Sequence, residues 1–82
     1  MYTYFQIKQT KNGDDMKIEY RIYELRARAG MTVTELAEKS GVSKSQINLI
    51  ENNGTNPTVL TICLIAEALG VQPSELFFIS EK

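Results

Sequence analysis

The chain has 82 residues, 43% of them hydrophobic, and a formal net charge of −1 at pH 7. This length suits one small domain with a single core, and no apolar stretch reaches the roughly 20 residues that a membrane-spanning helix needs. The sequence holds no histidine and one cysteine, which excludes histidine-based catalysis and an ordinary zinc site. We therefore expect a binding protein without a cofactor, not an enzyme. Since no signal peptide opens the chain, we expect a cytoplasmic location.

The first fifteen residues, 1–15, are expected to form an N-terminal extension. Residues 2–8 are rich in aromatic and β-branched side chains, and Asn12-Gly13 follows them, which predicts a short strand. Because a lone strand is unstable, this one needs a partner. Two pairings are open: with the apolar run 76–79 of the same chain, or with a second chain in a symmetric dimer. The alternative to both is a loosely ordered extension.

From residue 16 to residue 80 the pattern predicts a single helical domain. Its first helix is marked by apolar residues at spacings of four, three and four, and Gly30 supplies the stop. These apolar residues are Ile18, Ile22, Leu25 and Ala29. Lys17 and Arg21 would then lie on the exposed side of this helix.

Residues 32–57 predict two short helices, 33–39 and 44–52, joined by a tight turn at Gly41. Ser43 is a natural N-cap for the second helix. The residues expected to face inward are Leu36, Ala37, Val42, Ile47 and Ile50. This arrangement is a helix-turn-helix.

The outward face of the helix at 44–52 is polar. It carries Lys44, Ser45, Gln46 and Asn48. In a DNA-binding helix-turn-helix this face enters the major groove. We therefore expect these four side chains to read base edges.

The last part of the chain predicts two more helices. Thr58 caps a helix that Gly70 ends, and Pro73 starts a short helix over 73–77. The buried face of the longer helix is expected to hold Val59, Ile62, Leu64, Ile65 and Leu69. Cys63, among apolar neighbours, is expected to be mostly buried and inert. The predicted fold is all-α, a compact five-helix domain with a possible short N-terminal β-strand extension.

Seven short segments agree with a known family in order and spacing. They are Leu36-Ala37, Gly41-Val42-Ser43, Ile47, Ile50-Glu51, Asn56-Pro57, Leu69-Gly70-Val71 and Glu75-Leu76-Phe77. Together they resemble the Cro and phage-repressor family of helix-turn-helix proteins, also called the XRE family, over residues 17–78. The resemblance implies a repressor-like DNA-binding domain that binds double-stranded operator DNA as a homodimer and regulates transcription.

The resemblance also assigns roles to individual residues. It places Lys44, Ser45 and Leu49 at base-reading positions, and Asn52 and Asn53 near the DNA backbone. Further candidates for backbone contacts are Thr32, Thr34, Lys17 and Arg21. Arg26 and Glu51 stand where the family commonly has a structural ion pair, for which bidentate geometry would be suitable.

Two departures from the family pattern concern DNA binding. Leu49 stands where the family usually has a polar or basic reader, and an apolar side chain there can contact only a thymine methyl group. Val33 replaces a glutamine that often holds a phosphate, and the loop over 52–55 lacks the usual arginine or lysine. Residues 31–57 carry two lysines against three glutamates, so the predicted reading unit has no basic excess.

Two functions follow from these observations. The leading hypothesis is a sequence-specific DNA-binding transcriptional regulator, acting as a repressor. The alternative is that the helix-turn-helix fold serves as a protein-interaction module, such as an antitoxin-like or polymerase-contacting partner, which the missing basic residues would favour. Neither hypothesis involves a membrane or a small-molecule ligand.

Overall fold

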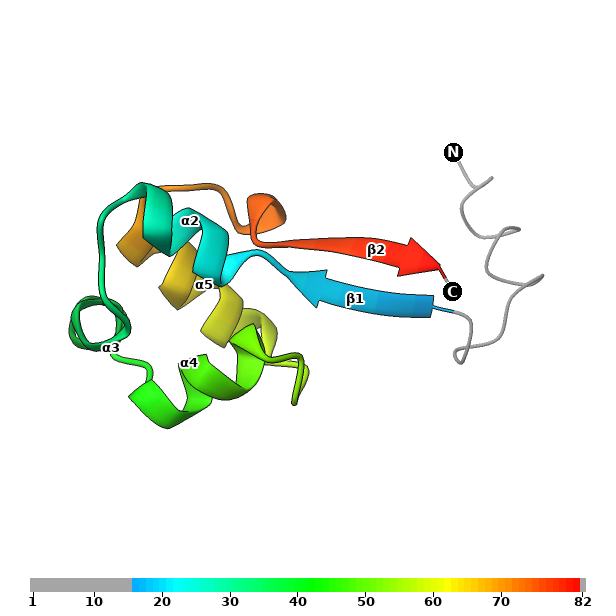
Figure 1. Cartoon of the computed structure of the whole chain (residues 1–82), viewed down its shortest axis with the longest axis horizontal. Helices are drawn as coiled ribbons and strands as arrows, with labels where there is room; N and C mark the ends of the chain where they lie inside the picture. The colour runs from blue at the N-terminus through cyan, green and yellow to red at the C-terminus, as the bar shows by residue number, and fades with distance from the viewer. Residues whose placement is uncertain (1–15, 82) are drawn as a thin grey trace.

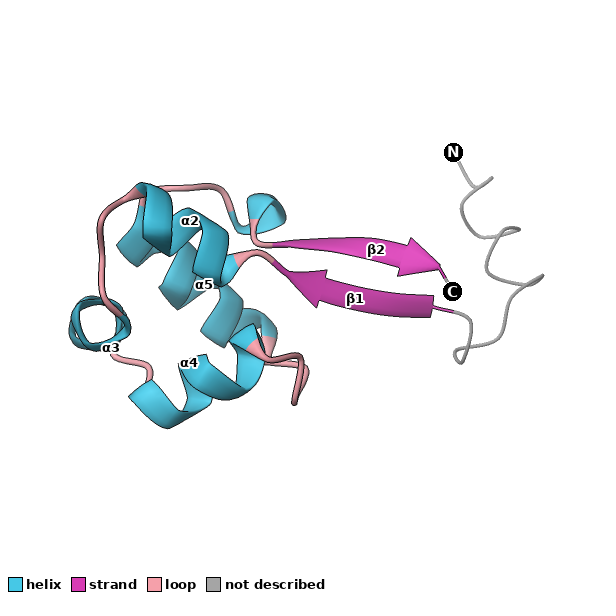
Figure 2. Cartoon of the chain, viewed as in Figure 1, coloured by secondary structure: helices cyan, strands magenta, loops and turns pink. Residues whose placement is uncertain are grey.

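The computed structural model describes residues 16–81 of the chain. Its elements are β1 (Met16–Tyr20), α2 (Ile22–Arg28), α3 (Val33–Ser40), α4 (Lys44–Glu51), α5 (Val59–Leu69), the 3₁₀ turn η2 (Pro73–Glu75) and β2 (Phe77–Glu81). Four helices pack together, and the two strands extend from them as a ribbon (Figures 1 and 2). The strand predicted over residues 2–8 lies outside the described residues.

The two strands come from opposite ends of the described chain and pair antiparallel. Ile18 lies opposite Ile79, and Tyr20 lies opposite Phe77, so these four residues share one face of the sheet. The backbone N–H of Arg21 donates a hydrogen bond of 2.7 Å to the carbonyl oxygen of Leu76. This contact ties the base of the ribbon to the helical part.

The prediction that a helix begins near residue 16 was wrong, because residues 16–20 form β1 and α2 begins at Ile22. The apolar spacing of Ile18 with Ile22 fits a helix, but strand pairing with residues 77–81 prevails over this local pattern. The apolar run near the C-terminus was predicted to pair with residues 2–8 or to leave them for a second chain, and residues 2–8 lie outside the described structure. The partner of this run in the described structure is β1.

The predicted fifth helix is a single 3₁₀ turn, so the described residues form four α-helices and a two-stranded sheet and not the expected all-α, five-helix domain. The carboxylate of Glu75 accepts a hydrogen bond of 3.0 Å from the N–H of Gln72, which closes the turn tightly. Leu76 follows, fully buried, and Phe77 already belongs to β2. The helix cannot continue because β2 requires extended backbone from Phe77 onward.

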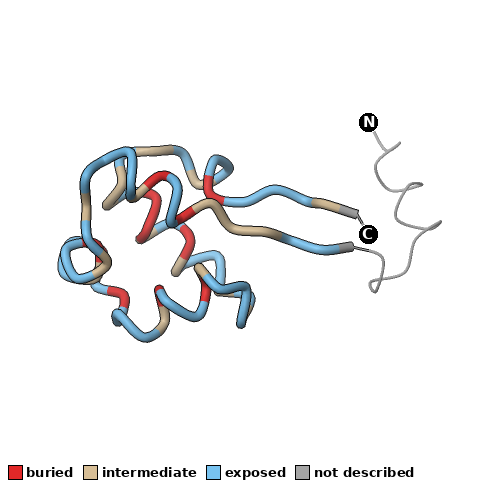
Figure 3. The backbone as a smooth tube through the Cα atoms, viewed as in Figure 1, coloured by how far each residue is buried: buried red, intermediate tan, exposed pale blue. Residues whose placement is uncertain are grey.

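The core lies between the helices. α3 packs against α4 and α5, and α2 packs against α4. The buried hydrophobic residues are Ile22, Leu25, Leu36, Val42, Ile47, Ile50, Ile62, Ile65, Ala66 and Leu76. The strands are less deeply buried than the helices (Figure 3). Within residues 16–81, no helix is long and apolar enough to cross a membrane.

The predicted buried face of α5 was only partly correct. Ile62 and Ile65 are buried, but Val59 is largely exposed and Cys63 is exposed as well. Leu64 and Leu69 are half-buried, and Ala66, which was not predicted to face inward, is buried in the core. Because α5 is apolar on almost every side, hydrophobic spacing alone does not identify its inward face.

Candidate nucleic-acid interface

The turn between α3 and α4 has the geometry that the sequence predicted. Gly41 has a φ of 79°, in the left-handed region, and its N–H donates a hydrogen bond of 2.9 Å to the carbonyl oxygen of Ala37. Val42 is buried, and its N–H donates to the hydroxyl oxygen of Ser40 at 3.1 Å. The turn thereby fixes the direction in which α4 leaves α3.

The position of α4 is fixed at its start and along its inner side. The hydroxyl oxygen of Ser43 accepts a hydrogen bond of 3.1 Å from the N–H of Gln46, as expected of an N-cap. Ile47 and Ile50 are fully buried. The helix is therefore held by a cap and an apolar stripe, which leaves its other side free.

The outward side of α4 presents a continuous row of exposed residues. Lys44, Ser45, Asn48 and Leu49 are exposed. The last three follow Lys44 by one, four and five residues, a spacing that places all four on one helix face. Leu49 leaves 53% of its surface accessible. Gln46 is half-buried, so it lies beside this face and not at its centre.

The loop that follows α4 is held by backbone contacts. Asn52 is the C-cap of α4, and Asn53 has a φ of 58°, a left-handed conformation that asparagine tolerates. The N–H of Gly54 donates a hydrogen bond of 2.7 Å to the carbonyl oxygen of Leu49. A Cβ atom at position 54 would lie 3.3 Å from Cδ2 of Leu49. The glycine therefore leaves room for the Leu49 side chain.

A hydrogen bond that the sequence analysis did not foresee anchors the same loop to the sheet. The phenol of Tyr20 donates to Oδ1 of Asn56 at 2.9 Å. Partial burial raises the pKa of the Tyr20 phenol, which keeps it protonated as a donor. The family motif Asn56-Pro57 marked one end of this contact in the sequence. The other end, Tyr20 on β1, lies 36 residues away and could not be inferred from the motif.

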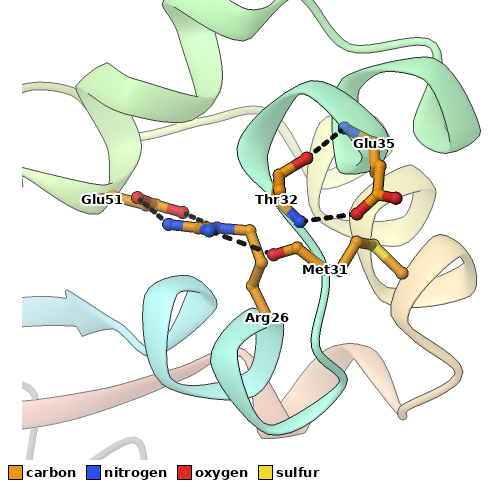
Figure 4. Close-up of polar contacts among 5 residues, drawn as sticks. All are labelled: Arg26, Met31, Thr32, Glu35 and Glu51. Carbon is orange, nitrogen blue, oxygen red and sulfur yellow. Dashed lines mark hydrogen bonds and ion pairs between the residues drawn. The ribbon is translucent and has the colours of Figure 1, made fainter.

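A capping box holds the start of α3 (Figure 4). The hydroxyl oxygen of Thr32 accepts from the N–H of Glu35 at 3.1 Å, and a carboxylate oxygen of Glu35 accepts from the N–H of Thr32 at 2.8 Å. The backbone N–H of Thr32 is thus engaged, whereas its hydroxyl proton remains available to donate. Thr34, two residues further along, is exposed.

Arg26 and Glu51 form a bidentate ion pair (Figure 4). Nε of Arg26 lies 2.9 Å from Oε2 of Glu51, and Nη2 lies 3.2 Å from Oε1. Nη1 donates to the carbonyl oxygen of Met31 at 3.1 Å, and the guanidinium carbon lies 5.1 Å from the ring centroid of Tyr23. The side chains of Arg26 and Glu51 are only 14% and 10% exposed. The hydrogen bond with Glu51 raises the pKa of Arg26.

This ion pair connects three parts of the fold. It links α2, the segment before α3 and the last residue of α4. The contacts with Met31 and Tyr23 were not foreseen, because neither is visible in the spacing of charged residues.

The expectation that Lys17 and Arg21 lie on the exposed side of one helix was wrong. Lys17 lies on β1, in the ribbon that extends away from the helices (Figure 1). Nε of Arg21 lies 3.3 Å from Oε1 of Glu24, whose other carboxylate oxygen lies 2.9 Å from Nη2 of Arg28. The hydrogen bond from Arg21 lowers the pKa of Glu24. The contact of these two cations with the DNA backbone stays a prediction.

The chemistry available on this surface is that of hydrogen-bond donors and acceptors, one ammonium group and one apolar side chain. Within residues 16–81, no three His, Cys, Asp or Glu side chains gather as a metal site. A surface of this kind can bind, and it is carried on a rigid helix between two well-held turns.

Comparison with known proteins agrees with this geometry. The family model described as "Helix-turn-helix" (HTH_3) matches residues 22–76. The chain is 44% identical over 48 residues to the HTH-type transcriptional regulator SutR of Escherichia coli K12, an alignment that covers 58% of this chain and 27% of SutR. It is 36% identical over 61 residues to the immunity repressor protein of Bacillus phage phi105, covering 74% of this chain and 42% of the repressor. It therefore spans less than half the length of either relative.

A solved structure shares the same fold. The restriction-modification controller protein C.AhdI of Aeromonas hydrophila superposes with a TM-score of 0.65 at 33% sequence identity, over 67% of this chain and 83% of that protein. The family match includes the whole of α3, the turn at Gly41 and α4. This chain belongs to the HTH_3, or XRE-type, helix-turn-helix family.

Proposed function

We propose that the chain is a sequence-specific DNA-binding transcriptional regulator that represses by occupying a promoter and reads the major groove with α4. The observation that carries this proposal is the row of exposed polar residues on the outward face of α4, next to a fully buried inner face. The family and the names of the curated relatives, which are transcriptional regulators and a repressor, support it.

The side chains on α4 suit different base edges. The amide of Asn48 can make a bidentate contact with adenine, and Lys44 can donate to guanine or to a phosphate. Ser45 can donate or accept. Leu49 can pack against a thymine methyl group. Gln46, which is half-buried, would reach a base only at the edge of this row.

Neutral donors at two places would hold the DNA backbone. Thr32 and Thr34 stand at the start of α3, and Asn52 and Asn53 stand just after α4. Such contacts position the helix without adding sequence information. They also release few counterions, so a single copy would bind weakly. We therefore propose that the chain acts as a homodimer that reads two half-sites.

The exposure of Leu49 does not by itself favour the protein-interaction alternative. The nearest outward residues of α4, Ser45 and Asn48, are polar. A single exposed apolar side chain in a polar setting is common on protein surfaces, whereas a protein interface needs a contiguous patch. The leucine fits a thymine methyl group in a groove that is otherwise read by hydrogen bonds.

The test is selection from a pool of random DNA duplexes, followed by fluorescence anisotropy with the selected and a scrambled duplex. Wild type should prefer the selected duplex. The double variant Ser45→Ala with Asn48→Ala should lose about 2–4 kcal/mol of that preference, from two base contacts. Lys44→Ala should weaken binding to both duplexes. Lys39→Ala, which removes an exposed lysine in the last turn of α3, serves as the control. Equal preference in wild type and the double variant would contradict the assignment.

A further inference from the structure

An apolar surface forms where one face of the sheet meets the first half of α5. We call it the ribbon–α5 surface and define it by Ile18, Val59, Leu60, Cys63, Phe77 and Ile79. All six side chains are exposed. Four of them, Ile18, Val59, Cys63 and Phe77, line a groove of about 460 Å³ between the sheet and α5, and Leu60 and Ile79 are the exposed residues next to it along α5 and β2. The lining of the groove from the described residues contains no charged side chain.

The strand register accounts for the sheet half of this surface. Ile18, Phe77 and Ile79 lie on one face because Ile18 is directly opposite Ile79 and Phe77 is two residues before it. The outer part of the ribbon extends beyond the helices (Figures 1 and 3). A two-stranded sheet is marginal by itself, so its apolar face needs a cover.

The helix half comes from the first two turns of α5. Val59, Leu60 and Cys63 are exposed although ten of the eleven residues of α5 carry no charge. A helix that is apolar on almost every side is normally covered on every side. One side of α5 is covered by the core through Ile62 and Ile65. The other side is left uncovered by residues 16–81 of a single chain.

The size of the surface matches one half of a protein–protein interface. Exposed fractions of 36% for Ile18, 79% for Val59, 68% for Leu60, 38% for Phe77 and 57% for Ile79 leave roughly 550 Å² of apolar area, at about 200 Å² per large side chain. A stable interface buries about 800 Å² per partner, of which roughly 60%, or about 480 Å², is apolar.

We infer that the ribbon–α5 surface is the contact between two copies of this chain, an inference that rests on the proposed function as a dimeric DNA-binding protein. No charged side chain of the described residues lines the groove, so two copies that each carry a net charge of −1 bring no like charges together inside it. In a two-fold dimer the same surface of each copy meets its counterpart. Apolar side chains suit such a contact because they need no oppositely charged partner. None of the outward residues of α4 lines the groove, so both reading helices stay free.

The test is sedimentation equilibrium of the full chain without DNA, comparing wild type with Leu60→Glu and Leu49→Glu. Leu60 is the second residue of α5, where a carboxylate is favourable beside the helix N-terminus and the fold should persist. In the dimer it would bury a charge on each copy, which should weaken association by roughly a hundredfold or more. Circular dichroism checks that both variants are folded.

Leu49→Glu is the matched control, since it makes the same change at an exposed leucine outside the surface. It should leave the dimer dissociation constant unchanged while it abolishes binding to DNA. This separates the two proposals, because association is measured without DNA. Wild type that stays monomeric at roughly 100 μM would overturn the inference and favour a different occupant of the surface. Equal association of wild type and Leu60→Glu would also overturn it.

Discussion

At the scale of single residues, the Arg26–Glu51 pair ties the end of α4 to α2. It is nearly buried, bidentate and supplemented by the carbonyl oxygen of Met31. The second ion pair of similar length, Arg28 with Glu24 at 2.9 Å, is exposed. Because desolvated pairs are costly to break and exposed pairs contribute little, two arginines of the same helix should behave very differently.

Arg26→Gln should lower the free energy of unfolding by about 2–3 kcal/mol, since it leaves the Glu51 carboxylate partly buried without its cation. Arg28→Gln should lower it by at most about 0.5 kcal/mol. Urea denaturation followed by circular dichroism measures both. Similar losses in the two variants would show that the Arg26 pair is no more than another surface contact.

Some residue roles could be predicted from the sequence, and others could not. The pairing of Arg26 with Glu51 and the outward place of Leu49 were expected from the resemblance to the helix-turn-helix family. The hydrogen bond between Tyr20 and Asn56 did not, because it joins β1 to a loop 36 residues away. Cys63 was expected to be buried but is exposed, since its apolar neighbours do not reveal which side of α5 faces the core.

At the scale of elements, side-chain caps mark the start of α3, α4 and α5. Thr32, Ser43 and Thr58 each accept a hydrogen bond from the N–H three residues later. Ser43 and Thr58 were predicted as caps from the sequence, because a capping hydroxyl acts within one turn of the helix, whereas Thr32 was not. β1 and the shortened fifth helix were not predicted, because β1 pairs with β2 at the other end of the chain and the turn leads directly into β2.

Two of these caps make a matched pair of variants. Ser43→Ala and Thr58→Ala should each lower the free energy of unfolding by about 1 kcal/mol. Only Ser43→Ala should also weaken binding to the selected duplex, because Lys44 and Ser45 stand in the first turn of α4. Thermal unfolding and anisotropy measure the two effects. If Thr58→Ala weakened DNA binding as much, the effect of Ser43→Ala would reflect stability alone.

At the scale of the whole molecule, the proposed DNA contact and the proposed dimer contact lie on different surfaces. The outward face of α4 is polar apart from Leu49, whereas the ribbon–α5 surface is apolar, and no described residue that lines its groove is charged. The net charge of −1 argues against tight binding to DNA through phosphates alone. A regulator with few cations gains affinity when two copies bring two reading helices to the same DNA. The proposed dimer contact would therefore compensate for the weak phosphate binding of a single copy.

The central claim is that the outward face of α4 contacts DNA, and NMR titration of the labelled chain with the selected duplex tests it most directly. The account predicts that backbone amide shifts concentrate in residues 43–49, with smaller changes at 32–34 and 52–55. Shifts concentrated in β1, β2 and α5, with α4 unaffected, would contradict it, as would the absence of shifts at any ratio of DNA to protein.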